Sequence, residues 1–141
     1  MIPLPVHIFT DGGSRGNPGP GAWAFVAVET KPGERGRIIM KASRHMGICT
    51  NNEAEYQAVI HALEWARSAG VMRVHLHSDS ELLVNQLLGA YKVRSKRLSG
   101  PHHRVRELLK GMEYTVEHHP REHRFISICD AMVNRTLDQE E

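Results

Sequence analysis

Cysteine is scarce in this chain of 141 residues, which contains only Cys49 and Cys129. Two cysteines so far apart form neither a zinc-binding motif nor the disulfide framework of a small secreted protein. We therefore expect reduced thiols. Each cysteine directly precedes a residue of a motif described below, so a disulfide between the two stays open.

Long apolar runs are absent as well, and residues 1–5 carry no basic leader. A membrane-spanning helix needs about 20 mostly apolar residues, so we expect a cytoplasmic protein with no membrane partner. Repeats and low-complexity tracts are also lacking. The length suits a single domain, residues 1–141, that builds its core without disulfides or a structural metal.

Neither sign of charge prevails, because the chain has 18 lysines and arginines and 16 acidic residues, which gives a formal net charge of +2. Bulk charge alone therefore does not indicate a nucleic-acid-binding protein. The distribution is more informative, because basic residues crowd one segment: Lys92, Arg94, Lys96, Arg97, Arg104 and Arg106. This segment is either a solvated helix face and loop or a patch that faces phosphates, and both interpretations stay open.

A glycine-rich stretch, residues 12–21, follows a short apolar segment that contains Val6, Ile8 and Phe9. The stretch lacks the lysine and serine or threonine that end a P-loop, and it does not match the dinucleotide fingerprint, which argues against a nucleotide-binding enzyme. The apolar segment predicts a buried strand with Asp11 at its carboxyl end. The glycines behind it allow a ligand to come close to main-chain N–H groups.

Further strands and helices follow from the apolar periodicity and the turn residues. The predicted strands are 6–9, 22–28, 38–49, 71–76 and 114–116, with a turn at 31–36. The predicted helices are 50–69, a helix after Ser80 with an apolar stripe of Leu83, Val84, Leu87 and Leu88, then 102–110 and 128–137. The first three strands form an antiparallel meander, because their connections are short.

The first helix connects the third and fourth strands, which implies a crossover. Right-handed crossovers place the fourth strand beside the first in parallel, so Asp11 and Asp79 lie at the same edge of the sheet. Thr50 and Glu53 have the spacing of a capping box. Glu55 precedes the apolar stripe of that helix by one position, so it lies at the edge of the buried face and can point toward Asp11.

Four acidic residues thus occupy comparable junctions: Asp11, Glu55, Asp79 and Asp130. The surrounding motifs are TDGGSRGNPGPGAW, TNNEAEYQAVIHALEWA, HSDSELLVNQL and DAMVNRTLD. Over nearly the whole chain they resemble type 1 ribonuclease H, in the compact variety without a basic protrusion. The resemblance implies an α/β, ribonuclease H-like fold, in which a five-stranded mixed sheet of three antiparallel and two parallel strands is flanked by helices.

Four ionised carboxylates in one cleft repel one another unless cations neutralise them. Oxygen ligands suit Mg²⁺, with Mn²⁺ as a substitute, and two ions about 4 Å apart can clamp both oxygens of a phosphodiester hydrolysis. The resemblance implies cleavage of the RNA strand of an RNA–DNA hybrid, leaving a 5′-phosphate and a 3′-hydroxyl. It implies that Asp11 bridges both ions, that Glu55 and Asp79 hold one, and that Asp130 holds the other.

The resemblance also implies contacts to the hybrid in its shallow minor groove, where the 2′-hydroxyls lie. The matching residues are Gly12, Gly13, Ser14, Asn17, Asn51 and Asn52. Thr50 matches a residue that grips a phosphate of the DNA strand, and helix N-terminal N–H groups favour phosphate as well. A purely structural role of Thr50 and Asn51 as helix caps is the alternative.

A catalytic histidine before the last aspartate is a further family feature. His123 in Arg121-Glu122-His123 matches it, with His118 and His119 as alternatives. The asparagine that normally follows is missing, and the spacing from His123 to Asp130 is two residues longer than in the family pattern. His61, His75 and His77 are expected to be structural or exposed, because no other ligand lies at zinc spacing around them.

The competing function is a catalytically silent nucleic-acid-binding domain of the same fold. The presence of all four carboxylates argues against it, because mutually repelling acids have no use in a domain that only binds. Double-stranded RNA is a second candidate substrate beside the hybrid. We expect a monomer.

Overall fold

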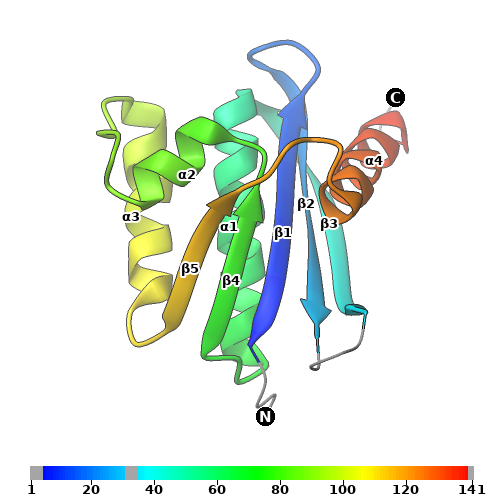
Figure 1. Cartoon of the computed structure of the whole chain (residues 1–141). Helices are drawn as coiled ribbons and strands as arrows, with labels where there is room; N and C mark the ends of the chain where they lie inside the picture. Colours follow the sequence, from blue (N-terminus) through cyan, green and yellow to red (C-terminus); the bar gives the residue numbers. More distant parts are fainter. Residues whose placement is uncertain (1–4, 31–34, 140–141) are drawn as a thin grey trace.

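The computed structural model describes residues 5–30 and 35–139 and shows one mixed sheet flanked by helices (Figure 1). In chain order the elements are β1 (Val6–Ser14), β2 (Gly19–Glu29), β3 (Arg37–Cys49), α1 (Asn51–Ser68), β4 (Arg73–Ser78), α2 (Glu81–Leu87), α3 (Lys96–Leu109), β5 (Glu113–His118) and α4 (Arg124–Gln139). The strand order is β3-β2-β1-β4-β5.

Both kinds of strand pairing expected from the sequence are present. β1 pairs with β2 and β2 with β3 in antiparallel register, whereas β1 with β4 and β4 with β5 are parallel. The α1 crossover therefore places β4 beside β1, as predicted. Asp11 and Asp79 consequently lie near the same edge of the sheet, because β4 ends at Ser78.

The two faces of the sheet are covered unequally. α1, α2 and α3 pack on one face, where Tyr56 and Leu63 of α1 lie with Ile8 and Phe25 in the larger apolar core. α4 packs on the other face, against β1, β2 and β3, with Val133 in a smaller core. β2 is buried on both faces and contributes alternate residues to the two cores. The β4 and β5 side of the α4 face has no helix over it among the residues described.

The start of α1 is fixed by its capping box, as the sequence predicts. The Thr50 side chain accepts a hydrogen bond from the Glu53 backbone N–H, and the Glu53 carboxylate accepts one from Thr50 N. Ala69 caps the other end and Gly70 follows with a positive φ of 75°. These contacts satisfy helix-end groups that otherwise lack partners, so the register of Glu55 is well defined.

Several predicted boundaries are wrong. β1 continues past Asp11 to Ser14, because residues 12–14 pair with residues 21–23 of β2. α3 begins at Lys96, not at residue 102, because burial of Leu98 outweighs the break suggested by Pro101. α4 begins at Arg124 instead of residue 128, and Leu88 lies outside the core with 58% of its surface exposed.

Three other expectations concern the cysteines, the turn at 31–36 and membrane-spanning helices. Both cysteines are free thiols, so the structure has no disulfide between them. Most of the turn predicted at 31–36 lies outside the described residues. Within the described ranges, no helix has the length and apolar character needed to cross a membrane.

Gly12 allows β1 and α1 to approach each other closely. A Cβ built on Gly12 would lie 2.3 Å from the carbonyl carbon of Ala54 and 2.5 Å from the backbone nitrogen of Glu55. No such contact is tolerated between real atoms. Gly12 thus serves the packing that positions Glu55, a role different from the ligand approach expected from the sequence. A Cβ on Gly13 would meet nothing closer than 3.8 Å.

We expect Gly12→Ala to lower the free energy of unfolding by about 2–3 kcal/mol, because the added methyl group overpacks two backbones. Urea unfolding measures this change. Gly13→Ala is the matched control and should stay within about 1 kcal/mol of the wild type. Equal stability of the two variants would contradict the role given to Gly12.

Candidate active site

Three carboxylates meet where β1 and β4 approach the start of α1. Asp11 comes from β1, Glu55 from the first turns of α1, and Asp79 from the residue directly after β4. Each offers an oxygen, and these oxygens lie within 4.8 Å of one another. Asp11 is 6% and Glu55 8% exposed, and the Asp79 side chain is 13% exposed. The sequence prediction therefore placed these three residues correctly.

Asp130 joins the same cleft from the opposite side. It lies on α4 and lines, with Asp11 and Glu55, a cleft of about 300 Å³. Its oxygens are not part of the group within 4.8 Å that the described residues form. Asp130 is also less buried than Asp11 and Glu55. The fourth carboxylate thus faces the cleft at a greater distance from the other three.

The crowding raises the pKa of two of these carboxyl groups. Burial, followed by the charge of Asp79, raises the pKa of Asp11 to about 7. Burial and the charges of Asp11 and Asp79 raise the pKa of Glu55 well above its ordinary value. The Gly12 backbone N–H opposes both shifts by hydrogen bonding. In the absence of cations the cluster therefore retains protons near neutral pH.

The Glu55 carboxyl group also has an orphaned atom. Its Oε2 is buried and has no hydrogen-bond partner among the described residues. A buried acceptor without a partner costs about 1–3 kcal/mol. A divalent cation would provide the missing partner and remove the repulsion. The donor set consists of hard carboxylate oxygens only, which fits Mg²⁺ or Mn²⁺ and not zinc.

Two further residues lie beside the carboxylates: Arg121, which sequence reasoning missed, and His118, which it named only as an alternative to His123. The Arg121 Nε lies 3.7 Å from Asp79 Oδ2, and Arg121 lines the cleft. The His118 Nε2 is 3.2 Å from the backbone oxygen of Asp79. His118 is the last residue of β5, whereas Arg121 belongs to the segment between β5 and α4. The Arg121-Glu122-His123 motif was interpreted only for its histidine, so the contact of Arg121 with Asp79 was not predicted.

His123 does not face the cleft. Its ring stacks on Phe9, with centroids 5.1 Å apart, and it lies 4.7 Å from the ring of His119. Its Nδ1 accepts a hydrogen bond from Phe125 N. Burial and the neighbouring His119 lower its pKa. Of the three candidate histidines, His118 contacts a residue of the carboxylate cluster, through the Asp79 backbone oxygen.

The residues expected to contact a substrate sugar form a connected network. Asn51 Oδ1 accepts hydrogen bonds from Ser14 N at 2.9 Å and Ser14 Oγ at 3.1 Å. Asn17 Oδ1 accepts one from Asn51 N at 3.0 Å. Gly12, Gly13, Ser14 and Asn51 line the cleft itself. The structure therefore ties the end of β1 to the start of α1 next to the carboxylates.

A second hollow of about 360 Å³ lies on the other side of the α1 N-terminus. Asn17, Thr50 and Asn52 line it together with three basic residues: Lys92, Arg94 and Arg97. Thr50 thus combines its capping role with a place in this hollow. Outside the hollow, Arg104 pairs with Glu64 and Arg106 donates to the Leu87 carbonyl. Within it, Arg97 also pairs with Glu53 of the capping box. Lys92, Arg94 and Arg97 therefore lie together at a hollow that can face a phosphate, whereas the later arginines belong to a solvated helix face.

Comparison with known proteins places this geometry in a family. A family model described as reverse transcriptase-like matches residues 9–135. The ribonuclease HI of Halobacterium salinarum is 40% identical over 134 residues, which cover 94% of this chain and 64% of that protein. The chain therefore spans 64% of the length of this curated relative. It spans 24% of the length of the next relatives, which are mycobacterial proteins.

Solved structures agree with the sequence comparison. The RNase H1 of Halobacterium salinarum superposes with a TM-score of 0.87 at 39% identity, covering 95% of this chain and 98% of that one. The N-terminal RNase H domain of rv2228c from Mycobacterium tuberculosis gives 0.87 at 30% identity, with coverages of 96% and 95%. LC11-RNase H1, solved in complex with an RNA/DNA hybrid, superposes with a TM-score of 0.86 at 35% identity. The match covers 96% of this chain and 98% of that one.

The sheet order and helix placement are those of a ribonuclease H fold. The chain belongs to the type 1 ribonuclease H family. Residues 88–95 alone connect α2 to α3, which agrees with the compact variety without a basic protrusion.

We expect the metal-free protein to lose stability as the pH rises from about 4 to 7. The folded state keeps a proton on Asp11 in this range, whereas the unfolded chain has released it, so raising the pH favours unfolding. From about pH 5 to pH 8 the loss attributable to Asp11 is about 2.5 kcal/mol. Urea unfolding in the presence of a chelator measures it.

Asp11→Asn is the matched variant for this measurement, because asparagine cannot titrate. Its stability should fall less than that of the wild type over the same range. The same slope in both proteins would show that Asp11 ionises normally.

Proposed function

We propose that this protein hydrolyses the RNA strand of RNA–DNA hybrids as an endonuclease. The observation that carries the proposal is the buried carboxylate cluster with its orphaned Glu55 Oε2, which opens into a cleft beside a basic hollow. Such a cluster costs stability unless cations fill it. Family membership and the hybrid bound to LC11-RNase H1 support the substrate class.

Asp11, Glu55, Asp79 and Asp130 would hold two Mg²⁺ ions, with Mn²⁺ as a substitute. Bound there, the ions would supply an activated water and stabilise the charge on the leaving 3′ oxygen, so that the products carry a 5′-phosphate and a 3′-hydroxyl. Asp11 is grouped with Glu55 and Asp79 and lines the same cleft as Asp130, which suits a bridging ligand. A cation bound to Asp79 would weaken its ion pair with Arg121, because both would share one negative charge.

Recognition of the hybrid is assigned to the two depressions that the N-terminus of α1 separates. Ser14 and Asn51 line the cleft and would contact the 2′-hydroxyls of the RNA strand, a contact that distinguishes RNA without base readout. In the hollow, Thr50, Lys92 and Arg97 suit a phosphate of the DNA strand. Double-stranded RNA remains the second candidate substrate, and we expect the protein to act as a monomer.

Asp11→Asn and Asp79→Asn should abolish cleavage of a labelled RNA–DNA hybrid while binding persists, because each removes a metal ligand but leaves the hollow intact. The assay uses Mg²⁺ or Mn²⁺, includes double-stranded RNA and DNA of the same sequence, and measures product ends. A chelator should stop the wild type. Glu113→Gln, an exposed change at the start of β5, is the control and should keep full activity.

Wild-type turnover in either aspartate variant would remove that residue from the site. Binding of the hybrid without any cleavage by the wild type would favour the catalytically silent domain.

His123→Ala should slow turnover roughly tenfold to a thousandfold if His123 moves a proton during the reaction. Such a role requires the segment before α4 to turn His123 away from Phe9 and into the cleft. Single-turnover rates on the hybrid measure the effect. His118→Ala is the matched comparison, because His118 already contacts the Asp79 backbone. An unchanged rate in His123→Ala, with a loss in His118→Ala, would transfer the role to His118.

A further inference from the structure

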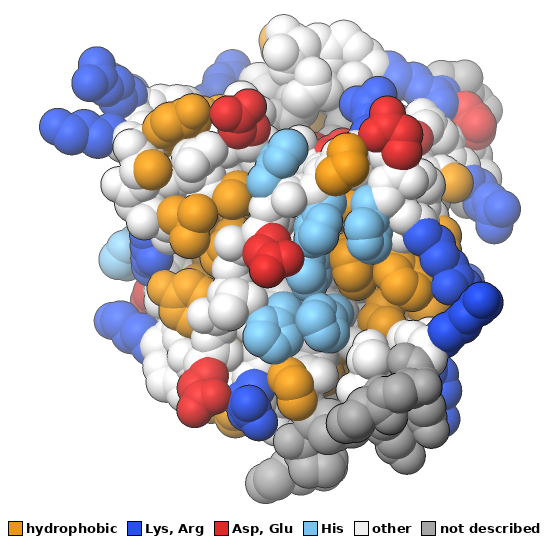
Figure 2. Space-filling view, in the orientation of Figure 1, with side chains coloured by type: hydrophobic (Ala, Val, Ile, Leu, Met, Phe, Trp, Pro, Cys, Tyr) orange, Lys and Arg blue, Asp and Glu red, His pale blue; other side chains and the backbone are white. Residues whose placement is uncertain are grey.

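Histidines gather on the part of the sheet that α4 leaves open. The parallel register places His7 beside His75, Phe9 beside His77, and His77 beside Glu117. His119 follows β5 and reaches the same place. Figure 2 shows the resulting histidine patch at the centre of this face, between the uncovered strands and the apolar side chains nearby. Sequence spacing did not reveal it, because the residues come from three separate strands and a loop.

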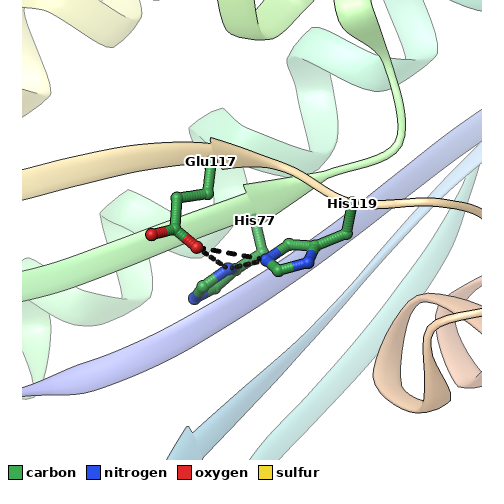
Figure 3. A group of neighbouring side chains, drawn as sticks. All are labelled: His77, Glu117 and His119. Atoms are coloured by element: carbon green, nitrogen blue, oxygen red, sulfur yellow. Dashed lines mark hydrogen bonds and ion pairs between the residues drawn. The ribbon is translucent and has the colours of Figure 1, made fainter.

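We propose that His77, Glu117 and His119 form a binding site for one Zn²⁺ ion, separate from the carboxylate site. The three side chains converge from β4, β5 and the segment after β5 (Figure 3). The proposal gives His77 a role beyond the structural one expected from the sequence. The site is independent of the proposed nuclease function, since it shares no ligand with the carboxylate cluster.

The ligand atoms already have nearly the spacing that zinc requires. His77 Nδ1 and His119 Nε2 are 2.7 Å apart, His119 Nε2 and Glu117 Oε2 are 3.3 Å apart, and His77 Nδ1 and Glu117 Oε2 are 3.7 Å apart. Tetrahedral Zn²⁺ with bonds of about 2.0–2.1 Å separates its ligands by about 3.3 Å. Relative to this spacing, the two histidine nitrogens are about half an ångström too close, and His77 Nδ1 and Glu117 Oε2 are slightly too far apart.

The surroundings of His77 fix the ring for metal binding. Its other nitrogen, Nε2, lies 2.9 Å from His7 Nδ1 and can donate its proton there, which leaves Nδ1 free as the ligand. Ligating histidines commonly have such a partner, which sets the tautomer. His77 is only 6% exposed, and its ring stacks on Phe9 with centroids 4.5 Å apart. Burial and the nearby His119 lower the pKa of His77 to about 3, so its imidazole is neutral.

The ligand chemistry favours zinc over the ions of the carboxylate site. Two imidazole nitrogens and one carboxylate are typical of zinc sites that keep a fourth position open to water, whereas Mg²⁺ prefers oxygen ligands alone. The Glu117 side chain is 60% exposed, so the open position can be reached from solvent.

A bound ion would join the segment after β5 to the paired strands β4 and β5. The His119 backbone N–H already donates to the Ser78 carbonyl at 2.9 Å, which places the ligand next to the end of β4. Beyond His119 the chain leads to His123 and α4. Zinc bound here would therefore hold the segment before α4 against β4 and β5 and stabilise the folded state.

Titration of the full chain with Zn²⁺ in a large excess of Mg²⁺, followed by calorimetry and thermal unfolding, tests the proposal. The Mg²⁺ keeps the carboxylate site occupied. We expect one equivalent of Zn²⁺ to bind and the Tm to rise. Co²⁺, used as a spectroscopic substitute, should give the intense visible bands of a tetrahedral site and not the weak bands of an octahedral one.

Glu117→Gln and His119→Gln should each weaken Zn²⁺ binding at least tenfold and remove the tetrahedral Co²⁺ spectrum. Glu117 is exposed, so its variant folds even if the His119 variant does not. His103→Gln, a change at an exposed histidine of α3, is the matched control and should bind as the wild type does. Absence of binding, or equal binding by all variants, would overturn the proposal, as would loss of binding in Asp130→Asn alone.

Discussion

The mutual repulsion of carboxylates held in a buried cluster is the constraint on which the rest of this structure depends. Asp11 and Glu55 lie almost out of contact with water, and Asp79 is close to both. Only a rigid frame can keep such groups together. β1 and α1 provide it through the close contact at Gly12 and the capping box at Thr50. The fold thus carries a local cost that a bound cation would offset.

The N-terminus of α1 connects the parts of the proposed site. Asn51 joins the end of β1 to the helix by accepting hydrogen bonds from Ser14, while Asn17 accepts one from the Asn51 backbone. The cleft with the carboxylates lies on one side of this junction and the basic hollow on the other. A duplex with one RNA strand and one DNA strand could therefore contact both depressions at once, with its RNA strand at the carboxylates.

Much of this arrangement follows from the sequence because it depends on local patterns. The capping box at Thr50 and Glu53, the crossover and three clustered carboxylates are all signalled by spacing along the chain. The features that the sequence did not predict depend on contacts between residues far apart in the chain. β1 extends beyond Asp11 because β2 pairs with it, α3 starts early because Leu98 finds a core, and Arg121 reaches Asp79 across a loop. The histidines around His77 likewise meet only through the pairing of parallel strands.

The central claim is that the carboxylate cluster holds two divalent cations that act on a bound hybrid. Anomalous diffraction from crystals grown with Mn²⁺ and a hybrid whose scissile linkage resists hydrolysis tests it most directly. The account predicts two manganese peaks about 4 Å apart, one on either side of Asp11, next to a phosphate of the RNA strand. Manganese peaks elsewhere on the molecule, or a cleft that binds the hybrid with no ion between Asp11, Glu55 and Asp79, would contradict it.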